Sequence, residues 1–452
     1  MPRRAALLVF ALALLPLAAC GGVNSALHRA ARPESPHERY ARSLRDAGLD
    51  ATALGRDWLA AAERSLTTAT PVALPFREAG YFAESEPRAV AYRVRARRGQ
   101  RIVAATDAQG YPAARVFVDV FEPPRDSATP PVRLTSADSA DGGVVRVAFE
   151  AGRDGEYVVR VQPELLRGVR YLVTLEATAS LAFPVDGRDG RAVRSYFGAV
   201  RDGGRRAHQG IDIFAPRGTP VRAAAGGVAN VGENELGGRV VWVWDPEHDR
   251  SLYYAHLDSQ AVRTGQVVRT GDTLGWVGNT GNARTTAPHL HFGIYARGEG
   301  PVDPYPFVYR PRAEPPAIAA DTGRLGTWRR VEGRRRLSLY AAPAEQAAGL
   351  TALRELEPRT VMRVEGAAGR YYRVRLPDGT DGYVAASGTS AADTPVERTR
   401  PARSAAVRDR PSPVAATLDS VEAGRPVPVL GRFGAYLFVR TPAGRTGWLA
   451  AD

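Results

Sequence analysis

Short runs that alternate apolar and polar residues are the feature that most constrains the fold of this chain. Five such runs lie between about residues 75 and 179, and glycine, proline or aspartate bounds each of them. Alternation buries one face of a strand, and the bounding residues favour turns. The pattern therefore predicts an antiparallel β-sandwich over residues 75–180. The five runs are AVAYRVRARRG, ARVFVDVFEP, GVVRVAFEA, GEYVVRVQP and RYLVTLEA.

The length, pattern and composition of the 452-residue chain predict a mainly β protein of three or four domains. From Tyr40 to about Thr68, apolar residues recur near helical spacing, which predicts one or two short helices. Residues 181–310 are strand-like and rich in glycine. The expected segments are a signal peptide (1–20), a tether with short helices (21–74), the β-sandwich (75–180), an all-β domain with the candidate chemistry (181–310), a linker (311–326), a first barrel (327–390), a linker (391–403) and a second barrel (404–452).

A weak internal repeat defines the two barrels. RYYRVRLPDGTDGYVAA (370–386) matches AYLFVRTPAGRTGWLAA (435–451) at a constant offset of 65 residues. Both copies carry a P-x-G turn and end in a glycine followed by an aromatic residue, Tyr383 or Trp448. Two copies of about fifty residues predict small barrels, and they resemble bacterial SH3-like domains. Tyr383 and Trp448 are expected to fill the barrel cores or their rims.

The N-terminal twenty residues have the pattern of an export signal. Arg3 and Arg4 precede an apolar run that is too short to span a bilayer. The run ends in LAAC, which resembles a bacterial lipobox and implies that Cys20 is lipidated. An ordinary secretory signal with a chance cysteine is the alternative. Cys20 is the only cysteine, so the chain has no disulfide and no cysteine nucleophile. We expect a cell-envelope protein that is lipid-anchored to a membrane on its extracytoplasmic side.

The charge of the chain narrows the choice of partners. The formal net charge is +13, and all 61 basic residues are arginine. A basic protein is drawn to anionic polymers such as cell wall, nucleic acid or a membrane surface. No arginine run is long enough to indicate nucleic acid, so no nucleic-acid partner is expected. The composition predicts no particular protein partner.

The candidate chemistry lies in the histidines of residues 181–310. The chain has seven histidines, and five donor side chains occur in three short motifs. His289 and His291 of PHLHF are two apart, so both point to one face of a strand. Gly210 permits a bend between the histidine and the aspartate of HQGID. A catalytic zinc takes three protein ligands and keeps one position open. The five candidates are His208, Asp212, His256, His289 and His291.

Less specific interpretations of these residues remain. HQGID is an ordinary loop if the five side chains do not meet in space. His256 in YYAHL, taken alone, is equally a histidine packed in a strand. His28 and His37 fall in the tether and are expected to have no role, and His248 lies in a charged, solvated turn.

Taken together, the motifs resemble the lysostaphin/LytM-type zinc endopeptidases. H-x3-D at 208–212 is followed by GTPV, Y-x-H-L, GNTG and HLHF in the order of that family, and the resemblance runs from about Ser195 to Pro306. It implies a small all-β peptidase domain that cuts bridges or stem peptides of peptidoglycan with Zn²⁺. Two departures concern the substrate groove. NARTTA (282–287) is about two residues longer than the usual spacer, and Gly293 stands where many relatives have glutamate.

The resemblance also implies roles for the individual residues. His208, Asp212 and His291 match the zinc ligands. His289 and His256 match the pair that activates the zinc-bound water and stabilises the transition state. A zinc-bound water with a pKa near 7 supplies hydroxide at neutral pH, and neutral imidazoles accept its proton.

These observations predict an exported, lipid-anchored zinc metalloendopeptidase that hydrolyses peptide bonds of peptidoglycan. A first alternative is a protein without activity that activates other cell-wall hydrolases, because some relatives have lost ligands. A second is a wall-binding adaptor in which the SH3-like modules do the main work. The presence of all five expected residues argues against the first alternative.

Overall fold

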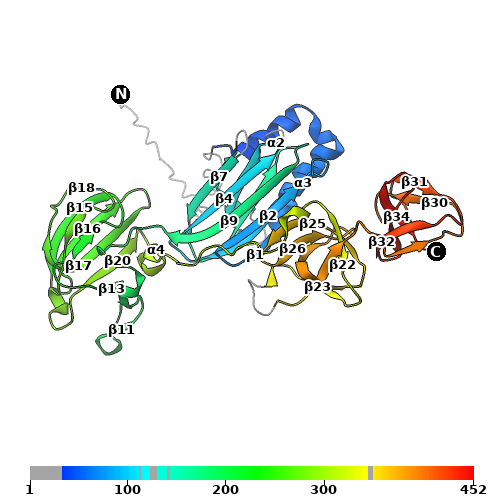
Figure 1. The fold of residues 1–452 in the computed structure, drawn as a ribbon. Helices are drawn as coiled ribbons and strands as arrows, with labels where there is room; N and C mark the ends of the chain where they lie inside the picture. The colour runs from blue at the N-terminus through cyan, green and yellow to red at the C-terminus, as the bar shows by residue number, and fades with distance from the viewer. Residues whose placement is uncertain (1–32, 111–113, 123–129, 140–142, 345–349, 452) are drawn as a thin grey trace, which may run out of the picture.

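The computed structural model describes residues 33–110, 114–122, 130–139, 143–344 and 350–451. The described chain is mainly β, as the sequence predicts. Figure 1 shows residues 181–310 at one end of the molecule, the N-terminal sheets in the middle and residues 404–451 at the other end. Among the residues described, no helix has the length and apolar character needed to cross a bilayer. Cys20, His28 and the predicted signal peptide lie outside the described residues.

Two helices pack on the N-terminal sheets. Helix α2 (Pro36–Asp46) begins with a capping box in which Ser35 and Glu38 accept hydrogen bonds from each other's backbone amides. Helix α3 (Ala53–Thr67) carries Trp58, whose ring stacks on His37 at a centroid distance of 4.7 Å. The His37 side chain also hydrogen-bonds Gln162 Oε1 at 2.7 Å and is buried. The sequence-based view that His37 has no role was therefore wrong, because it is a core residue of the α2 interface.

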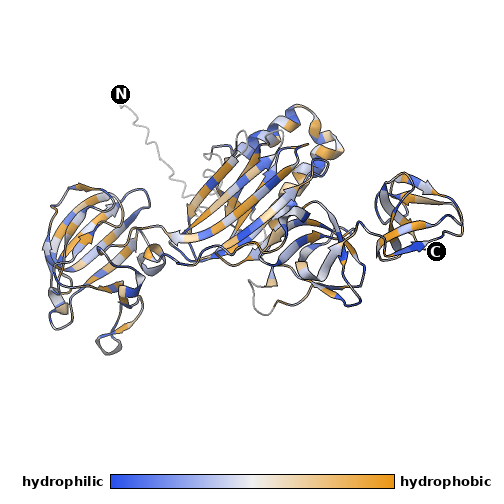
Figure 2. Cartoon of the chain, viewed as in Figure 1, coloured by the Kyte–Doolittle hydropathy of each residue, from blue (hydrophilic) through white to orange (hydrophobic). Residues whose placement is uncertain are grey.

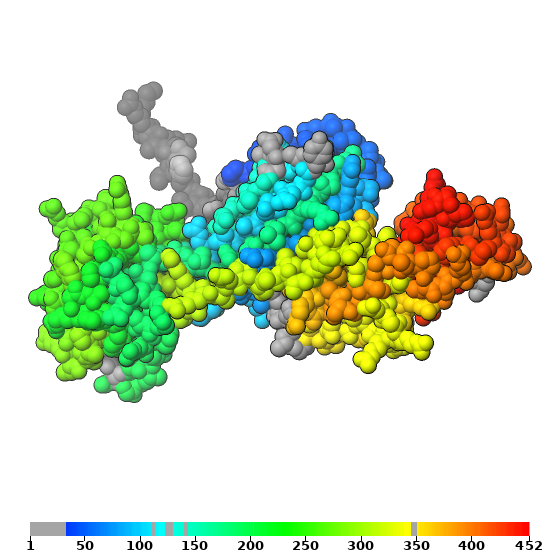
Figure 3. All heavy atoms as spheres, viewed as in Figure 1, coloured from blue at the N-terminus to red at the C-terminus, as the bar shows by residue number. Residues whose placement is uncertain are grey.

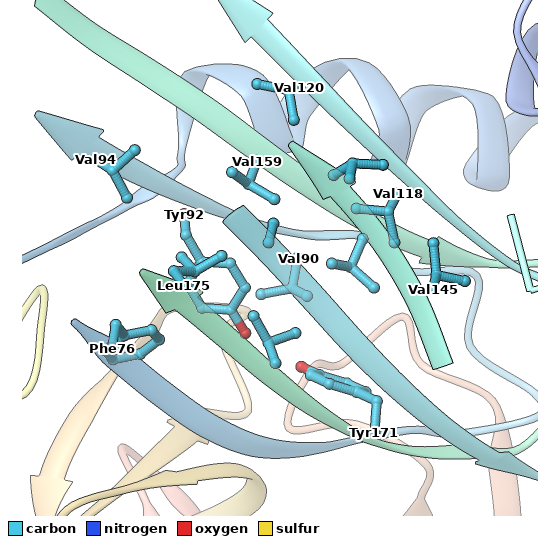
Figure 4. Packing of buried hydrophobic residues seen from close by; sticks show 14 of the residues in the cluster. Phe76, Val90, Tyr92, Val94, Val118, Val120, Val145, Val159, Tyr171 and Leu175 are labelled. Carbon is cyan, nitrogen blue, oxygen red and sulfur yellow. The ribbon is translucent and has the colours of Figure 1, made fainter. Parts of the chain in front are cut away.

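The middle of the molecule contains two sheets that share one hydrophobic core. One sheet has the order β1-β3-β8-β5-β6, and the other contains β2-β9-β4-β7. Strands β2, β4 and β9 bury alternate side chains, and hydrophobic and hydrophilic positions are interspersed along the strands (Figure 2). The buried residues of both sheets meet between them (Figure 4). The strands are β1 (Thr70–Val72), β2 (Phe76–Phe82), β3 (Val90–Ala96), β4 (Gln100–Gly110), β5 (Val116–Glu122), β6 (Val132–Asp138), β7 (Gly143–Glu150), β8 (Gly155–Pro163) and β9 (Val169–Ala179).

The second of these sheets continues into the C-terminal half of the chain. Strand β2 pairs antiparallel with β25, with Ala79 opposite Ala367 and Gly80 opposite Gly366. The resulting sheet has nine strands, because further C-terminal strands extend it beyond β25. These strands are β22 (Trp328–Val331), β25 (Val361–Ala368), β26 (Tyr371–Arg375), β27 (Asp381–Ala385) and β28 (Thr389–Ala391), with β23 (Leu337–Leu339) and β24 (Arg354–Leu356) forming a separate pair nearby.

A buried ion pair joins the two parts of this continuous sheet. Glu78 on β2 is fully buried, and its Oε1 accepts hydrogen bonds from Tyr92 at 2.8 Å and from Arg373 Nε at 3.0 Å. Its Oε2 accepts one from the Tyr383 hydroxyl at 2.5 Å. Tyr383 therefore packs in the interface with the N-terminal sheets as well as in the first repeat. The segment 311–326 also lies along the N-terminal sheets (Figure 3), where Pro311 and Ala313 line a hollow with Leu74.

The internal repeat is visible as two equivalent hairpins. Strands β33 (Tyr436–Arg440) and β34 (Thr446–Ala450) repeat the bounds of β26 and β27 at the offset of 65 (371 + 65 = 436, 381 + 65 = 446). Trp448 takes the place of Tyr383 and packs against Phe438 and Trp328 at the junction of the two repeats. The remaining strands of this six-stranded sheet are β29 (Glu397–Thr399), β30 (Ala405–Arg408), β31 (Thr417–Val421) and β32 (Val427–Phe433).

Residues 181–310 form a separate sheet with its own core (Figure 1). Its main path is β10-β13-β20-β17-β16-β15-β18, with β14, β19 and β21 attached and the short helix α4 (Tyr305–Val308) at its end. The strands are β10 (Val193–Ser195), β13 (Ile211–Phe214), β14 (Pro220–Arg222), β15 (Gly227–Asn234), β16 (Gly238–Asp245), β17 (Arg250–Gln260), β18 (Val267–Val268), β19 (Thr273–Val277), β20 (His289–Ala296) and β21 (Gly300–Val302), and the hairpin β11 (Val200–Arg201) and β12 (Arg206–Ala207) stands beside them.

Candidate active site

Three donor side chains meet at the neighbouring strands β13 and β20 of this sheet. Antiparallel pairing places Asp212 on β13 directly opposite His291 on β20. His208 lies just before β13, and the two intervening residues turn its ring back toward the same face. The ligand atoms of these three residues all lie within 4.8 Å of one another. The structure therefore brings together the three residues that the resemblance marks as zinc ligands.

The three donor atoms form a nearly equilateral triangle. His208 Nε2 lies 2.9 Å from His291 Nδ1 and 3.0 Å from Asp212 Oδ1, and His291 Nδ1 lies 3.1 Å from the same oxygen. Tetrahedral ligands with zinc bonds of about 2.0–2.2 Å are about 3.3–3.6 Å apart. The triangle is slightly tighter than that and has the right donors, two imidazole nitrogens and one carboxylate oxygen. These residues fit a zinc ion.

The protonation states also suit a cation. Burial raises the pKa of Asp212, but the adjacent imidazoles of His208 and His291 outweigh it and hold the pKa well below its usual range. Burial lowers the pKa of His291, although Asp212 opposes the shift. The carboxylate is therefore ionised and the His291 imidazole neutral at neutral pH, which are the forms that bind a metal.

Backbone and side-chain contacts orient His208. Its Nδ1 lies 3.0 Å from the carbonyl oxygen of Tyr196 and 3.3 Å from Ser195 Oγ. A carbonyl only accepts, so Nδ1 carries the proton and the lone pair of Nε2 is available to a cation between the three donor atoms. Metal-binding histidines are commonly held in this way, by a hydrogen bond from the second ring nitrogen.

Gly210 allows the two ligand strands to approach closely. A Cβ atom there would lie 2.5 Å from the carbonyl oxygen of Phe292 and 2.7 Å from Cε1 of His291. The φ angle of Gly210 is not positive, so its backbone conformation does not itself require glycine. The chain bends at Gly210, as the sequence predicts, and the absence of a side chain also leaves room for the His291 ring.

His289 and His256 lie beside the triangle and face each other. Their ring centroids are 5.0 Å apart, and His289 Nε2 lies 3.9 Å from Asp212 Oδ1. His289 Nδ1 donates to the carbonyl of Ala287 at 2.8 Å, and His256 Nδ1 donates to that of Thr280 at 2.9 Å. In both rings Nε2 is therefore the nitrogen with the free lone pair. Burial, followed by the nearby His289 and His291, lowers the pKa of His256 to about 4, so this ring is neutral at pH 7.

The backbone at His256 has an unusual conformation. Its φ is +62°, in the left-handed region that residues with a Cβ rarely adopt. Strand β17 changes partner at this point, pairing with β20 up to Ala255 and with β19 from Leu257. The His256 amide instead donates to Gly237 O at 2.7 Å. Such strained backbone is typical of functional sites, where it directs a side chain, and the sequence contains no signal for it.

Arg201 is a residue of the site that the sequence analysis missed. Its Nη2 donates to Asp212 Oδ2 at 2.6 Å. In a chain whose basic residues are all arginine, nothing in the sequence distinguishes this one.

The two departures from the family pattern that the sequence shows, in residues 282–287 and at Gly293, leave the donor atoms in place. Ala287 contributes its carbonyl to His289, and Gly293 lies against the ring of Tyr295. His248 is half-exposed at the far end of the sheet and hydrogen-bonds Asp245.

Comparisons with known proteins agree with this site. Residues 206–304 match the model of Peptidase family M23. The L-Ala–D-Glu endopeptidase of Bacillus subtilis (strain 168) is 39% identical over 139 residues, which cover 28% of this chain and 42% of that protein. The peptidoglycan DD-endopeptidase ShyC of Vibrio cholerae is 38% identical over 117 residues, covering 24% and 26% respectively. These matches support the family resemblance.

The similarity is confined to part of each protein. The chain spans less than half the length of the curated relatives it matches first. Among solved structures, the catalytic domain of lysostaphin from Staphylococcus simulans is 32% identical and covers 25% of this chain and 90% of that one, with a TM-score of 0.24.

Proposed function

We propose that this protein is a zinc-dependent endopeptidase that hydrolyses peptide bonds of peptidoglycan. The observation that carries the proposal is the triangle of His208, Asp212 and His291, with two further imidazoles turned toward it. The donor set, two nitrogens and one oxygen, is one that catalytic zinc sites use. The similar proteins are named as an L-Ala–D-Glu endopeptidase and a peptidoglycan DD-endopeptidase, which supports the choice of substrate.

The chain's own residues divide the chemistry between them. His208, Asp212 and His291 would hold the zinc, which supplies Lewis acidity and a water of lowered pKa. His289 and His256 present unprotonated Nε2 atoms on the same side of the triangle. One of these atoms accepts the proton of the attacking water. Once protonated, it donates a hydrogen bond to the developing oxyanion.

Mass spectrometry of the digestion products tests the proposed activity and identifies the peptide bond that is cut. Purified peptidoglycan is digested with the protein lacking residues 1–20, with the Asp212→Asn variant as the control. We expect new muropeptides that differ from the undigested wall by hydrolysis of one type of peptide bond. The two relatives named above act on different bonds, so the mass of the product identifies which one this chain cleaves. Identical digests from both proteins would contradict the proposal and favour a non-catalytic activator.

We also propose that Cys20 carries a lipid anchor and that the protein works at the extracytoplasmic face of a membrane. The sequence LAAC supports this, with the short apolar run before it. Cys20→Ser should move the protein from the membrane to the soluble fraction or stop its processing. Unchanged fractionation, without a lipid-dependent mass difference, would contradict the anchor.

We further propose that the two N-terminal sheets form a β-sandwich domain and that the C-terminal repeats are SH3-like modules that bind the wall. The shared core between the two sheets supports the first assignment. The equivalent hairpins at an offset of 65 residues support the second. Two weak modules on one chain raise the local concentration of the enzyme at its polymeric substrate.

A further inference from the structure

Arg201 reaches the candidate metal centre from a hairpin that stands apart from the main sheet. Strands β11 and β12 pair only with each other among the described strands. The base of the hairpin is tied to a ligand residue, because the His208 amide donates to Ala199 O and His208 O accepts from the Gly198 amide, both at 2.8 Å.

A single nitrogen of Arg201 makes both contacts. Nη2 donates to Asp212 Oδ2 at 2.6 Å and to Ser195 Oγ at 2.5 Å. Ser195 lies opposite Asp212 in the β10–β13 register, and its hydroxyl is also 3.3 Å from His208 Nδ1. Arg201 therefore touches one ligand directly and a second ligand through one hydroxyl.

As a result, the two carboxylate oxygens of Asp212 have different partners. Oδ1 faces His208 Nε2 and His291 Nδ1, and Oδ2 is taken by the guanidinium. A carboxylate that is free to turn offers a metal both oxygens. A second oxygen would occupy the position that a catalytic zinc keeps open for water.

We propose that Arg201 is a positioning residue that keeps Asp212 a one-oxygen ligand and so preserves the open position of the metal. This inference rests on the proposed function. The positive charge also withdraws electron density from the carboxylate and leaves a bound cation more electrophilic. Partners of metal ligands commonly change metal affinity or activity by about 10–100-fold when they are removed.

The test compares Arg201→Lys with Arg201→Met in the protein lacking residues 1–20. Because one nitrogen makes both contacts, the single ammonium of lysine can replace it, whereas methionine keeps the bulk without the donor or the charge. Arg297→Met is the matched control, since it breaks an exposed Arg–Asp pair of the same domain, with a 3.5 Å contact to Asp249. Three quantities are measured: the visible spectrum of the Co²⁺-loaded protein, zinc retention against a chelator, and turnover of muropeptides.

We expect Arg201→Met to weaken the visible Co²⁺ absorption, because metal ions with more than four ligands absorb less intensely. Turnover should fall about 10–100-fold, whereas zinc retention should not fall, because Asp212 then offers the metal both oxygens. Arg201→Lys should retain the parent spectrum and most of the turnover, and Arg297→Met should match the parent throughout. Equal behaviour of the lysine and methionine variants would overturn the inference, as would an Arg201→Met protein that loses its metal.

The Co²⁺ spectrum separates this inference from the proposed function. If the parent binds Co²⁺ as a four-coordinate ion and Arg201→Met changes that spectrum, the inference holds even when no wall is digested. If the parent digests wall and all three variants share its spectrum, only the inference fails. A parent that binds neither Co²⁺ nor Zn²⁺ would overturn both.

Discussion

At the scale of single residues, Gly210 is the position where one methyl group should do most damage. Gly210→Ala would place a Cβ atom 2.5 Å from Phe292 O and 2.7 Å from the His291 ring. Overpacking of this kind costs about 1–3 kcal/mol of the free energy of unfolding, and displacement of His291 should also lower zinc occupancy. Gly232→Ala is the control, because the nearest atom to its Cβ is 3.7 Å away. Urea unfolding and elemental analysis measure both effects, and equal results for the two variants would contradict this role of Gly210.

His37 should make the protein sensitive to mild acid. Burial, followed by the charge of Arg160, lowers the pKa of His37 to about 3, against about 6.5 in the unfolded chain. Between these values the unfolded state binds a proton that the folded state does not, so stability falls with falling pH by about 1.4 kcal/mol per unit. Above pH 6.5 the histidine has no such effect.

The His37→Gln variant isolates this contribution. It loses the stacking on Trp58 at every pH but no longer titrates. Between pH 7 and pH 5, wild type should lose about 2 kcal/mol more stability than the variant in urea unfolding. Equal losses would show that His37 is protonated in the folded protein.

At the scale of elements, the sequence predicts those features that depend on a local residue pattern. Alternation locates the strands, the two-residue spacing of His289 and His291 places both on one face, and the 65-residue repeat reappears as two hairpins with the same offset. These features depend on neighbours along the chain. The Arg201–Asp212 contact, the left-handed φ of His256 and the β2–β25 pairing depend on which distant segments meet. No periodicity encodes those choices.

The buried pair at the β2–β25 junction should behave unlike a surface pair. Arg373→Met leaves the fully buried Glu78 carboxylate without its counter-charge, which costs about 3–5 kcal/mol. Adding Glu78→Gln should recover much of that loss, because the remaining partners are neutral hydroxyls. The exposed pair of Arg354 with Asp378 is the control, where Arg354→Met should cost about 0–1 kcal/mol. Thermal unfolding that is unchanged in Arg373→Met would contradict the interface.

At the scale of the whole molecule, the first repeat belongs structurally to the N-terminal sheets. Deleting residues 325–452 would remove β25 and Arg373 and expose the edge of β2, so that deletion would disturb the fold as well as wall binding. The second repeat makes fewer contacts with the body, and Trp448 and Phe438 form its main junction with Trp328.

Deletion of residues 393–452 is therefore the cleaner test of wall binding. Loss of one of two modules should lower sedimentation with insoluble peptidoglycan, while cleavage of small soluble muropeptides persists. Thermal unfolding of the shortened protein checks that the remainder stays folded. Unchanged sedimentation would leave this repeat with a structural role only.

Three side chains should hold a metal, and two others should act on what the metal binds. Zinc content, measured beside the hydrolysis rate in one preparation of each variant, tests this most directly. The alanine variants are those of His208, Asp212, His291, His256 and His289. The first three should lose zinc and activity together. The last two should keep about one zinc per chain and lose about 10²–10³ in rate. Wild-type protein that holds no zinc and digests no wall would contradict the account, and so would a His289→Ala protein that loses zinc while His291→Ala retains it.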